Sequence, residues 1–239
     1  MLIRSAAIIG HTGLIGGYLL DQYKKKIRNL DLFNSKNINE INKKKKYDVI
    51  FCSALPATKW IANKAPIKDK KNLLKLIRNL RKINTKKFLL VSTIDVHHKH
   101  SYGKNRKILE KFVKKQFKKN FIVRLPGVFG KGLKKNIIFD LMNKNELSQI
   151  HLNDKFQWYD LNNLYKDISQ IFRYNKVGVN ELYSVPIKNV EIIKLFKGIK
   201  NFKKRLKPIN YSIKPKEGFY KDKKYILNRI KKFIDLNEK

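Results

Sequence analysis

Cysteine is almost absent from this sequence, and methionine and tryptophan are nearly so, with one, two and two residues respectively among 239. The single Cys52 excludes an intramolecular disulfide, and its place in the apolar run VIFCSAL indicates a small core residue in a reducing compartment. Long hydrophobic runs are missing too, since none approaches the roughly 18 residues that suggest a membrane span. The N-terminus lacks a signal-peptide pattern. We therefore expect a cytoplasmic protein with no membrane partner.

Acidic residues are also scarce, with 18 Asp and Glu against 56 Lys and Arg, for a formal charge of +38. Phosphate backbones attract such chains, so association with nucleic acid or an anionic surface is one alternative. However, only nine of the basic residues are Arg, leaving 47 Lys, and Asn and Ile are abundant as well. A drift toward AT-rich codons produces this joint excess and spreads lysines over every solvated face. We therefore do not expect nucleic acid as the partner.

Short apolar runs alternate with helical patterns along the first half of the chain. This alternation is typical of an α/β protein with a parallel sheet and crossover helices. The predicted strands are 5–10, 30–34, 48–54, 87–93 and 120–126, and the predicted long helices are 14–26, 66–83 and 101–119. Beyond residue 130 the pattern weakens to helices near 136–143 and 161–174 and a helical tail. The predicted fold is a Rossmann-like doubly wound sheet with a small C-terminal cap.

The stretch GHTGLIGG follows the first predicted strand and opens the first predicted helix. Its glycines form G-x-x-G-x-x-G. In this pattern the first glycine supports a tight turn, the second lets the backbone approach a pyrophosphate, and the third permits close contact of the helix. Free N–H groups at the helix start would face the phosphates. The pattern predicts dinucleotide binding by Gly10, Thr12, Gly13, Leu14, Ile15 and Gly16. Accordingly, we assign residues 1–130 to an NAD(P)-binding domain and 131–239 to a substrate-binding cap, with some segments of the latter returning to the sheet.

The residue that selects between NAD and NADP is expected at the end of the second strand, where NAD-selective sites usually carry an acid. Here that position is Asn34, followed by Ser35 and Lys36. No carboxylate would repel a 2′-phosphate there, so the sequence favours NADP slightly over NAD. Asp31 lies close enough that a small register error would restore an acid.

A second group of residues lies in VSTIDVHHKHSYGKNR, between 91 and 106. Tyr102 and Arg106 are four apart in a predicted helix and share a face. A nearby cation lowers the pKa of a phenol and makes it a better acid/base. Thr93 ends the preceding strand and offers a hydroxyl to the same substrate carbonyl. We expect these three residues to be the catalytic set.

The motif order GHTGLIGG, CSALPA, VSTIDV, YGKNR with Glu110, and RLPGVFG resembles the extended short-chain dehydrogenases/reductases, particularly their nucleotide-sugar epimerase, dehydratase and reductase group. The resemblance covers about residues 5–175. It implies Thr93 as the hydroxyl residue and Tyr102 as the general acid/base. It also places Asp95 at the acidic position of the dehydratase-type S-T-x-E pattern. The cofactor would further contact Ala54, Leu55 and Pro56, and the nucleotide sugar would contact Asp95, Lys131, Asn136 and Gln157.

Three features depart from the family pattern. Arg106 stands where the family has Lys, and a planar guanidinium does not replace a compact ammonium. The connection from Asn34 to Asp48 is too short for a full strand-helix-strand unit, so one unit is trimmed or missing. The C-terminal region is shorter than usual.

Other residues allow two interpretations. His97, His98 and His100 invite a metal site, but without a helical i, i+4 pair or a Cys we expect a polar loop and no metal. Trp60 either borders the cofactor or has a packing role. Arg124 either supports the active-site loop or is a surface or rim residue.

The sequence thus predicts an NAD(P)-dependent oxidoreductase or epimerase acting on a nucleotide sugar. The first alternative is a catalytically degenerate NADP-binding protein of the same fold, and binding through the lysine-rich surface is the second. A homodimer through helices 66–83 and 101–119 is a further expectation.

Overall fold

The computed structural model describes residues 3–43, 46–200, 202 and 207–237. The chain divides into two compact units. Unit 1 contains residues 1–124 and 163–180, and unit 2 contains residues 125–162 and 181–239. Each unit is described by itself.

Unit 1 is built on a six-stranded sheet in the order β2-β1-β3-β4-β5-β9. Strands β1 to β4 are parallel, with Ile9 opposite both Phe33 and Cys52. The interior positions of β1, β3 and β4 are mostly buried apolar residues, as a sheet covered on both faces requires, whereas the edge strand β2 is only half-buried. The strands are β1 (Ser5–Ile9), β2 (Asn29–Phe33), β3 (Tyr47–Cys52), β4 (Thr85–Thr93), β5 (Asn120–Leu125) and β9 (Gly178–Glu181).

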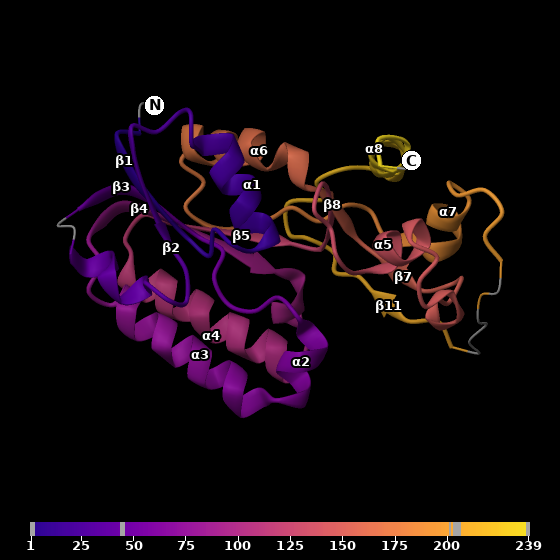
Figure 1. Cartoon of the computed structure of the whole chain (residues 1–239), viewed down its shortest axis with the longest axis horizontal. Coiled ribbons are helices and arrows are strands. Elements are labelled where there is room, and N and C mark those ends of the chain that lie inside the picture. Colours follow the sequence, from indigo (N-terminus) through magenta and orange to yellow (C-terminus); the bar gives the residue numbers. More distant parts are fainter. Residues whose placement is uncertain (1–2, 44–45, 201, 203–206, 238–239) are drawn as a thin grey trace. The chain divides into compact units, whose positions relative to one another are not determined.

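Helices cover both faces of this sheet (Figure 1). Helices α1 (Leu14–Tyr23) and α6 (Leu164–Arg173) pack together on one face. Helices α3 (Pro66–Leu80) and α4 (Ser101–Gln116) pack together on the other. In α3 the residues that enter the core, Leu73, Leu76, Ile77 and Leu80, recur at helical spacing. The predicted doubly wound α/β architecture is confirmed.

The connection between β2 and β3 contains only the short 3₁₀ helix η1 (Ile38–Lys43). The expected loss of one strand-helix-strand unit is therefore confirmed for this connection, because β3 pairs directly with β1. Ile38 and Ile41 of η1 are buried and take part in the core of unit 1. A short 3₁₀ helix thus takes the place of a crossover helix in this connection.

Several predicted boundaries are wrong by a few residues. The helices expected to end at 26, 83 and 119 end at Tyr23, Leu80 and Gln116. The segment after β3, for which the sequence predicted no helix or strand, contains helix α2 (Lys59–Lys64). Its sequence KWIANK buries only Ala62, so it has no apolar periodicity to reveal it. None of the described helices has the length and apolarity that crossing a bilayer requires.

Unit 2 combines two small sheets with short helices around one apolar core. Strand β6 (Gly127–Phe129), which the sequence did not predict, pairs in parallel with β8 (Trp158–Asp160). A second sheet has the order β10-β7-β11, with β7 (Lys155–Phe156), β10 (Ile187–Lys188) and β11 (Asn210–Tyr211). The helices are α5 (Ile137–Met142), η3 (Leu147–Gln149), η4 (Leu161–Asn163), α7 (Asn189–Ile193) and α8 (Lys223–Asp235). Phe129, Trp158, Ile192 and Ile230 lie in the core.

Candidate functional site

The glycine turn between β1 and α1 has two glycines that its own chain requires. Gly10 has φ +90°, and a Cβ there would approach the carbonyl oxygen of Ser53 to 2.9 Å. A Cβ on Gly16 would overlap the carbonyl of Gly10. The Gly10 N–H donates to Phe33 O at 2.8 Å and ties the turn to the end of β2. These contacts explain the first and third glycines of the motif.

Gly13 differs from these two, because nothing in the chain demands a glycine there. Its φ is −83°, and an added Cβ would lie at an ordinary 3.5 Å from its nearest neighbour, Gly10 O. It is the N-cap of α1, whose first turn carries no acid and whose cap has no side-chain hydrogen bond. Leu14 and Ile15 begin the helix, so their N–H groups lack intrahelical acceptors. Exposed Thr12 completes a surface that fits a diphosphate.

The end of β2 lies beside this turn, because Ile9 pairs with Phe33. Asn34 follows, and its side-chain oxygen accepts from the Lys36 N–H at 2.8 Å. Ser35 and Lys36 are exposed. Asp31 lies inside β2, where its carboxylate accepts from the Tyr47 hydroxyl at 2.9 Å. The register error that would bring an acid to the strand end does not occur.

The end of β3 lies on the other side of the turn. The Ser53 N–H donates to Ile9 O at 2.9 Å, and Leu55 has a positive φ of 88°. Ala54 and Leu55 pack against the core of unit 1, while Pro56 offers its carbonyl to Arg106. The three predicted cofactor-binding groups thus meet at the carboxyl ends of β1, β2 and β3, where ligands of open α/β sheets bind.

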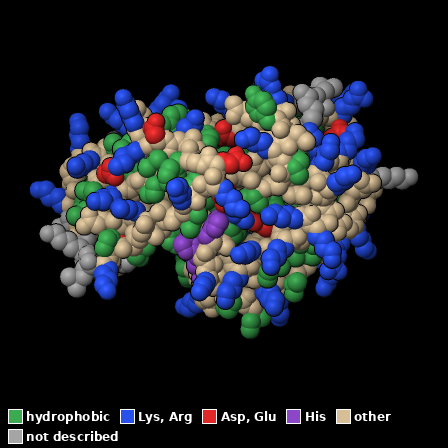
Figure 2. All heavy atoms as spheres, turned by 180° about the vertical axis from the view of Figure 1, so that it is seen from behind, with side chains coloured by type: hydrophobic (Ala, Val, Ile, Leu, Met, Phe, Trp, Pro, Cys, Tyr) green, Lys and Arg blue, Asp and Glu red, His purple; other side chains and the backbone are tan. Residues whose placement is uncertain are grey.

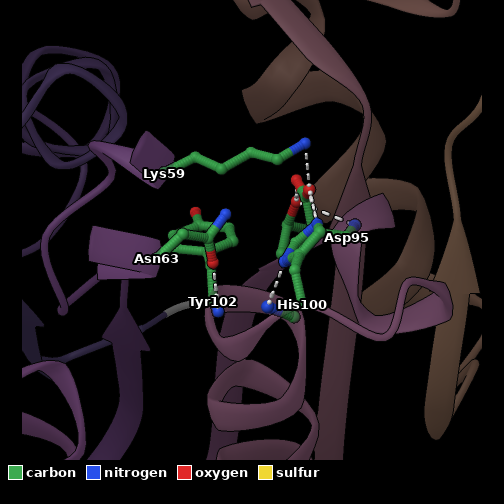
Figure 3. A network of polar contacts seen from close by, with 7 residues as sticks. Lys59, Asn63, Asp95, His100 and Tyr102 are labelled. Atoms are coloured by element: carbon green, nitrogen blue, oxygen red, sulfur yellow. Dashed lines mark hydrogen bonds and ion pairs between the residues drawn. The ribbon is translucent and has the colours of Figure 1, made fainter. Parts of the chain in front are cut away.

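A polar cluster forms where β4 ends (Figure 3). The Asp95 carboxylate accepts from the Thr93 hydroxyl at 2.8 Å and lies 2.9 Å from the Lys59 ammonium and 3.1 Å from His100 Nε2. His100 is the N-cap of α4, where its Nδ1 accepts from the Gly103 N–H at 3.1 Å. An accepting Nδ1 carries no proton, so this hydrogen-bond network assigns the Nε2–H tautomer, which donates to Asp95.

Helix α2 contributes to this cluster at two points one turn apart. Lys59 reaches Asp95, and Asn63 Oδ1 accepts from the Tyr102 N–H at 2.9 Å (Figure 3). Sequence analysis missed Lys59 and Asn63 and assigned no such role to His100. The i, i+4 spacing of Lys59 and Asn63 was the available signal, but it has no meaning unless a helix is expected there.

Gly103 allows helix α4 to pack closely against the turn that carries Asp95. A Cβ on Gly103 would overlap the carbonyl of Asp95 and come within 2.9 Å of His98 O. The first turn of α4 therefore lies directly against the turn η2 (Ile94–His97) that carries Asp95. This close packing holds Tyr102 near the Thr93–Asp95 pair.

Arg106 lies over the Tyr102 ring, with its Cζ 4.0 Å from the centre of the phenol ring. Its guanidinium donates to Asp69 of α3 at 2.6 Å and to the Pro56 carbonyl at 2.6 Å. Asn105 also donates to Asp69, at 2.7 Å. Asp69 and Arg106 are both buried, so the residue at the family's Lys position is held in an ion pair between two helices. Asp69 was not anticipated.

The expected lowering of the Tyr102 pKa is wrong. Burial raises the pKa of this phenol above its ordinary value, and the charge of the Arg106 guanidinium opposes the rise without cancelling it. The sequence shows the cation four residues away but does not show that the ring is buried. Tyr102 is therefore protonated at neutral pH.

Arg124 and Glu110 form a second buried support. Arg124 donates to both oxygens of Glu110, at 2.9 and 2.6 Å, and Ser92 donates to the same carboxylate at 2.6 Å. The pair links α4 to the end of β5 and to β4. Arg124 is thus held by α4, and its support of the active-site loop stays a prediction.

Unit 2 holds three of the residues expected to contact the substrate. Asn136 caps α5, accepting from the N–H groups of Ile138 and Phe139 and donating to Val128 O. Gln157 is buried and makes three hydrogen bonds, with Ser184 O and with both backbone groups of Ile213. Lys131 is exposed. Substrate contact by these residues stays a prediction, and the first two have packing roles in the structure.

His97, His98 and His100 lie near one another, with the rings of His98 and His100 stacked at 5.8 Å. Within the described part of the chain, no group of three His, Cys, Asp or Glu side chains has the arrangement to hold a metal ion. His97 Nε2 lies 3.3 Å from Arg124, and His100 belongs to the Asp95 cluster.

No family model and no curated protein sequence matches this chain. Solved structures do. UDP-N-acetylglucosamine 4-epimerase from Methanobrevibacter ruminantium has a TM-score of 0.74 at 14% identity, covering 98% of both chains. A dTDP-4-dehydrorhamnose reductase from Yersinia enterocolitica has 0.71 at 15%, covering 97% of this chain and 99% of its own. The same kind of reductase from Bacillus anthracis, solved in complex with NADP, has 0.69 at 16%, covering 98% and 97%.

These identities are low, so the likeness is one of fold. It extends over nearly the whole length of both chains in each comparison. The predicted resemblance to the extended short-chain dehydrogenases/reductases of nucleotide sugars is therefore confirmed at the level of the fold.

Proposed function

We propose that the chain is an NAD(P)-dependent oxidoreductase or epimerase that acts on a sugar joined to a nucleoside diphosphate. One observation carries the proposal: the glycine turn, with its open Gly13 and uncapped helix start, belongs to the same sheet edge as the Thr93, Asp95 and Tyr102 group. The similar solved structures include nucleotide-sugar reductases and epimerases, which supports this substrate class.

The cofactor would lie across the carboxyl ends of β1 to β3. Gly10, Gly13 and the first N–H groups of α1 would hold its diphosphate, and residues 54–56 would border it. Asn34, Ser35 and Lys36 would receive the adenosine ribose without an opposing carboxylate, which supports NADP over NAD. When bound, this nicotinamide supplies the hydride acceptor or donor.

Tyr102 would transfer the proton. Its raised pKa keeps the phenol protonated at neutral pH, which is the form that donates to the oxygen of a sugar carbonyl during reduction. In this structure the Thr93 hydroxyl donates to Asp95, so it would have to turn from that carboxylate to donate to the same oxygen. Residues 131–136 and the rest of unit 2 would bind the nucleotide sugar. Pairing of two copies through α3 and α4 stays a prediction.

A thermal-shift comparison of NAD, NADP and a panel of UDP-, GDP-, CDP- and dTDP-sugars tests ligand binding, because a ligand of the folded state raises the unfolding temperature. We expect NADP to give the larger cofactor shift. For a substrate found this way, Tyr102→Phe should lower turnover by about 10² or more while NADP affinity stays within about twofold. Unchanged turnover in Tyr102→Phe would contradict the role of the phenol.

A second candidate is an NADP-binding protein that has lost catalysis. The observation in its favour is the commitment of Arg106 to Asp69 and Pro56, which holds its guanidinium within the helix pair. Arg106→Lys separates the two candidates. If the natural chain is an enzyme that uses Arg106, the Arg106→Lys variant has lower turnover than the natural chain. If the natural chain is inactive and the variant is active, the natural site is degenerate.

A further inference from the structure

Helices α3 and α4 expose many cations and no acids. Both helices are fully described, and their only acids, Asp69 and Glu110, are buried in the ion pairs with Arg106 and Arg124. The exposed cations are Lys68, Lys70, Lys71, Lys75 and Arg78 on α3, and Lys104, Lys107, Lys111, Lys114 and Lys115 on α4. We call the surface formed by α2, α3 and α4 the basic face.

The opposite helix layer of unit 1 is different. Lysine and arginine side chains are spread widely over the side of the molecule that Figure 2 shows, as a compositional drift predicts. Yet the only exposed cations of α1 and α6, which have ten residues each, are Lys166 and Arg173, and α1 also exposes the acid Asp21. Helices α3 and α4 have 15 and 16 residues. The cations are thus denser on the basic face than a uniform drift explains.

Exposed apolar side chains gather on the same three helices. Trp60 is 67% exposed and Ile67 73%, and three further residues, Ile61, Leu74 and Ile108, are also exposed. These are five of the ten large apolar side chains that are exposed among the described residues. A groove of about 210 Å³ combines the two kinds of group, since Ile67, Lys70 and Lys104 all line it. Exposed apolar side chains that lie close together are typical of interaction surfaces.

The chemistry of this face selects among partners. A second copy would set the cations of one face against those of the other, with no exposed acid on α3 or α4 to offset them. Nucleic acid makes little use of exposed isoleucines, and only one of the ten cations is Arg. An anionic bilayer suits both features: lysines attract acidic headgroups while Trp and aliphatic side chains enter the interface.

We propose that the basic face binds the surface of membranes that contain anionic lipid. This reverses the expectation from the sequence that the chain has no membrane partner, and it competes with the predicted pairing of two copies through α3 and α4, which would cover the same face. The inference does not depend on the reaction that the chain catalyses. It requires no spanning segment, since the contact is made by side chains at the headgroup level. Such binding would hold unit 1 against the bilayer by the layer α3–α4.

Co-sedimentation of the full chain with vesicles tests this proposal. The vesicles contain phosphatidylcholine alone or phosphatidylcholine mixed with phosphatidylglycerol. At about 50 mM salt we expect binding to the mixed vesicles only. Combining Lys70→Gln, Lys107→Gln and Lys111→Gln should lower the partition coefficient at least about tenfold. The matched control, Lys25→Gln, Lys166→Gln and Lys231→Gln, removes the same charge from exposed positions elsewhere and should change it less than about threefold.

A second variant tests the apolar contribution. Part of the binding should persist at about 300 mM salt, because salt does not screen the insertion of apolar side chains. Trp60→Ser with Ile67→Ser should abolish this part. Circular dichroism establishes that each variant is folded.

Three results would overturn the proposal. Equal losses in the two lysine variants would show that only the total charge matters. An RNA oligonucleotide that binds more tightly than the vesicles, and that the basic-face lysine variant weakens, would identify a nucleic-acid surface. A dimer in sedimentation velocity that Ile67→Ser converts to a monomer would show that a second copy covers the face.

Discussion

Two carboxylates flank Tyr102, and they differ in how their cations are held. Asp69 pairs with Arg106 across α3 and α4, and the two side chains are only 3% and 7% exposed. Asp95 pairs with Lys59, whose side chain is 38% exposed, and it also accepts from Thr93 and His100. The buried pair is closed to water, whereas in the half-exposed pair the ammonium of Lys59 reaches solvent although Asp95 is itself buried. We therefore expect the first to be a structural support and the second to exchange partners when a ligand binds.

The largest effect is expected when the buried pair is broken. Asp69→Ala leaves the Arg106 guanidinium buried without its counter-charge, which should lower the free energy of unfolding by about 3–5 kcal/mol. Urea denaturation followed by circular dichroism measures this loss. Adding Arg106→Met to Asp69→Ala should restore part of the stability, because no buried charge then remains. A single-variant loss below about 1 kcal/mol would show that Arg106 finds water or another acceptor.

His100 tests the connection between the half-exposed cluster and helix α4. His100→Ala removes the acceptor for the Gly103 N–H and should cost about 1 kcal/mol of unfolding free energy, as for other lost N-caps. His100→Asn keeps a side-chain acceptor at the cap and removes the reach to Asp95. We expect it to retain stability within about 0.5 kcal/mol. If both variants lose the same stability, the contact with Asp95 matters more than the cap.

The smallest stability effect is expected at Lys59. Lys59→Met keeps the aliphatic stem and removes the ammonium, and an ion pair this accessible to water contributes less than about 1 kcal/mol. Thermal and urea unfolding should therefore hardly change. Turnover on a substrate should fall, because Asp95 then loses a partner beside Thr93. A stability loss as large as that of Asp69→Ala would remove the distinction between the two carboxylates.

Much of the fold followed from local patterns. The spacing of Leu73, Leu76 and Leu80 predicted α3, and the short Asn34–Asp48 connection predicted a trimmed crossover. The glycine turn was predicted from its position after a buried strand. Helix α2 was missed because its contacts are polar and its length is six residues, too short for periodicity to show.

The site was predicted less completely than the fold. Thr93, Tyr102 and Arg106 were chosen by spacing along the chain, but the partner of Arg106 lies 37 residues away in sequence. Lys59 and Asn63 come from a helix that was not expected. The Tyr102 pKa had the wrong predicted direction, because desolvation depends on packing around the ring and not on the residue four positions later.

The sequence by itself determined which segments become strands and helices and where the glycine turn stands, because periodicity and backbone sterics act between near neighbours in the chain. Only the tertiary structure decided that Arg106 is paired to Asp69, that Lys59 and His100 meet at Asp95, and that the cations of α3 and α4 share one face. Those arrangements depend on how separate helices pack on the sheet. Contacts between distant segments are created by that packing and leave no local spacing to read.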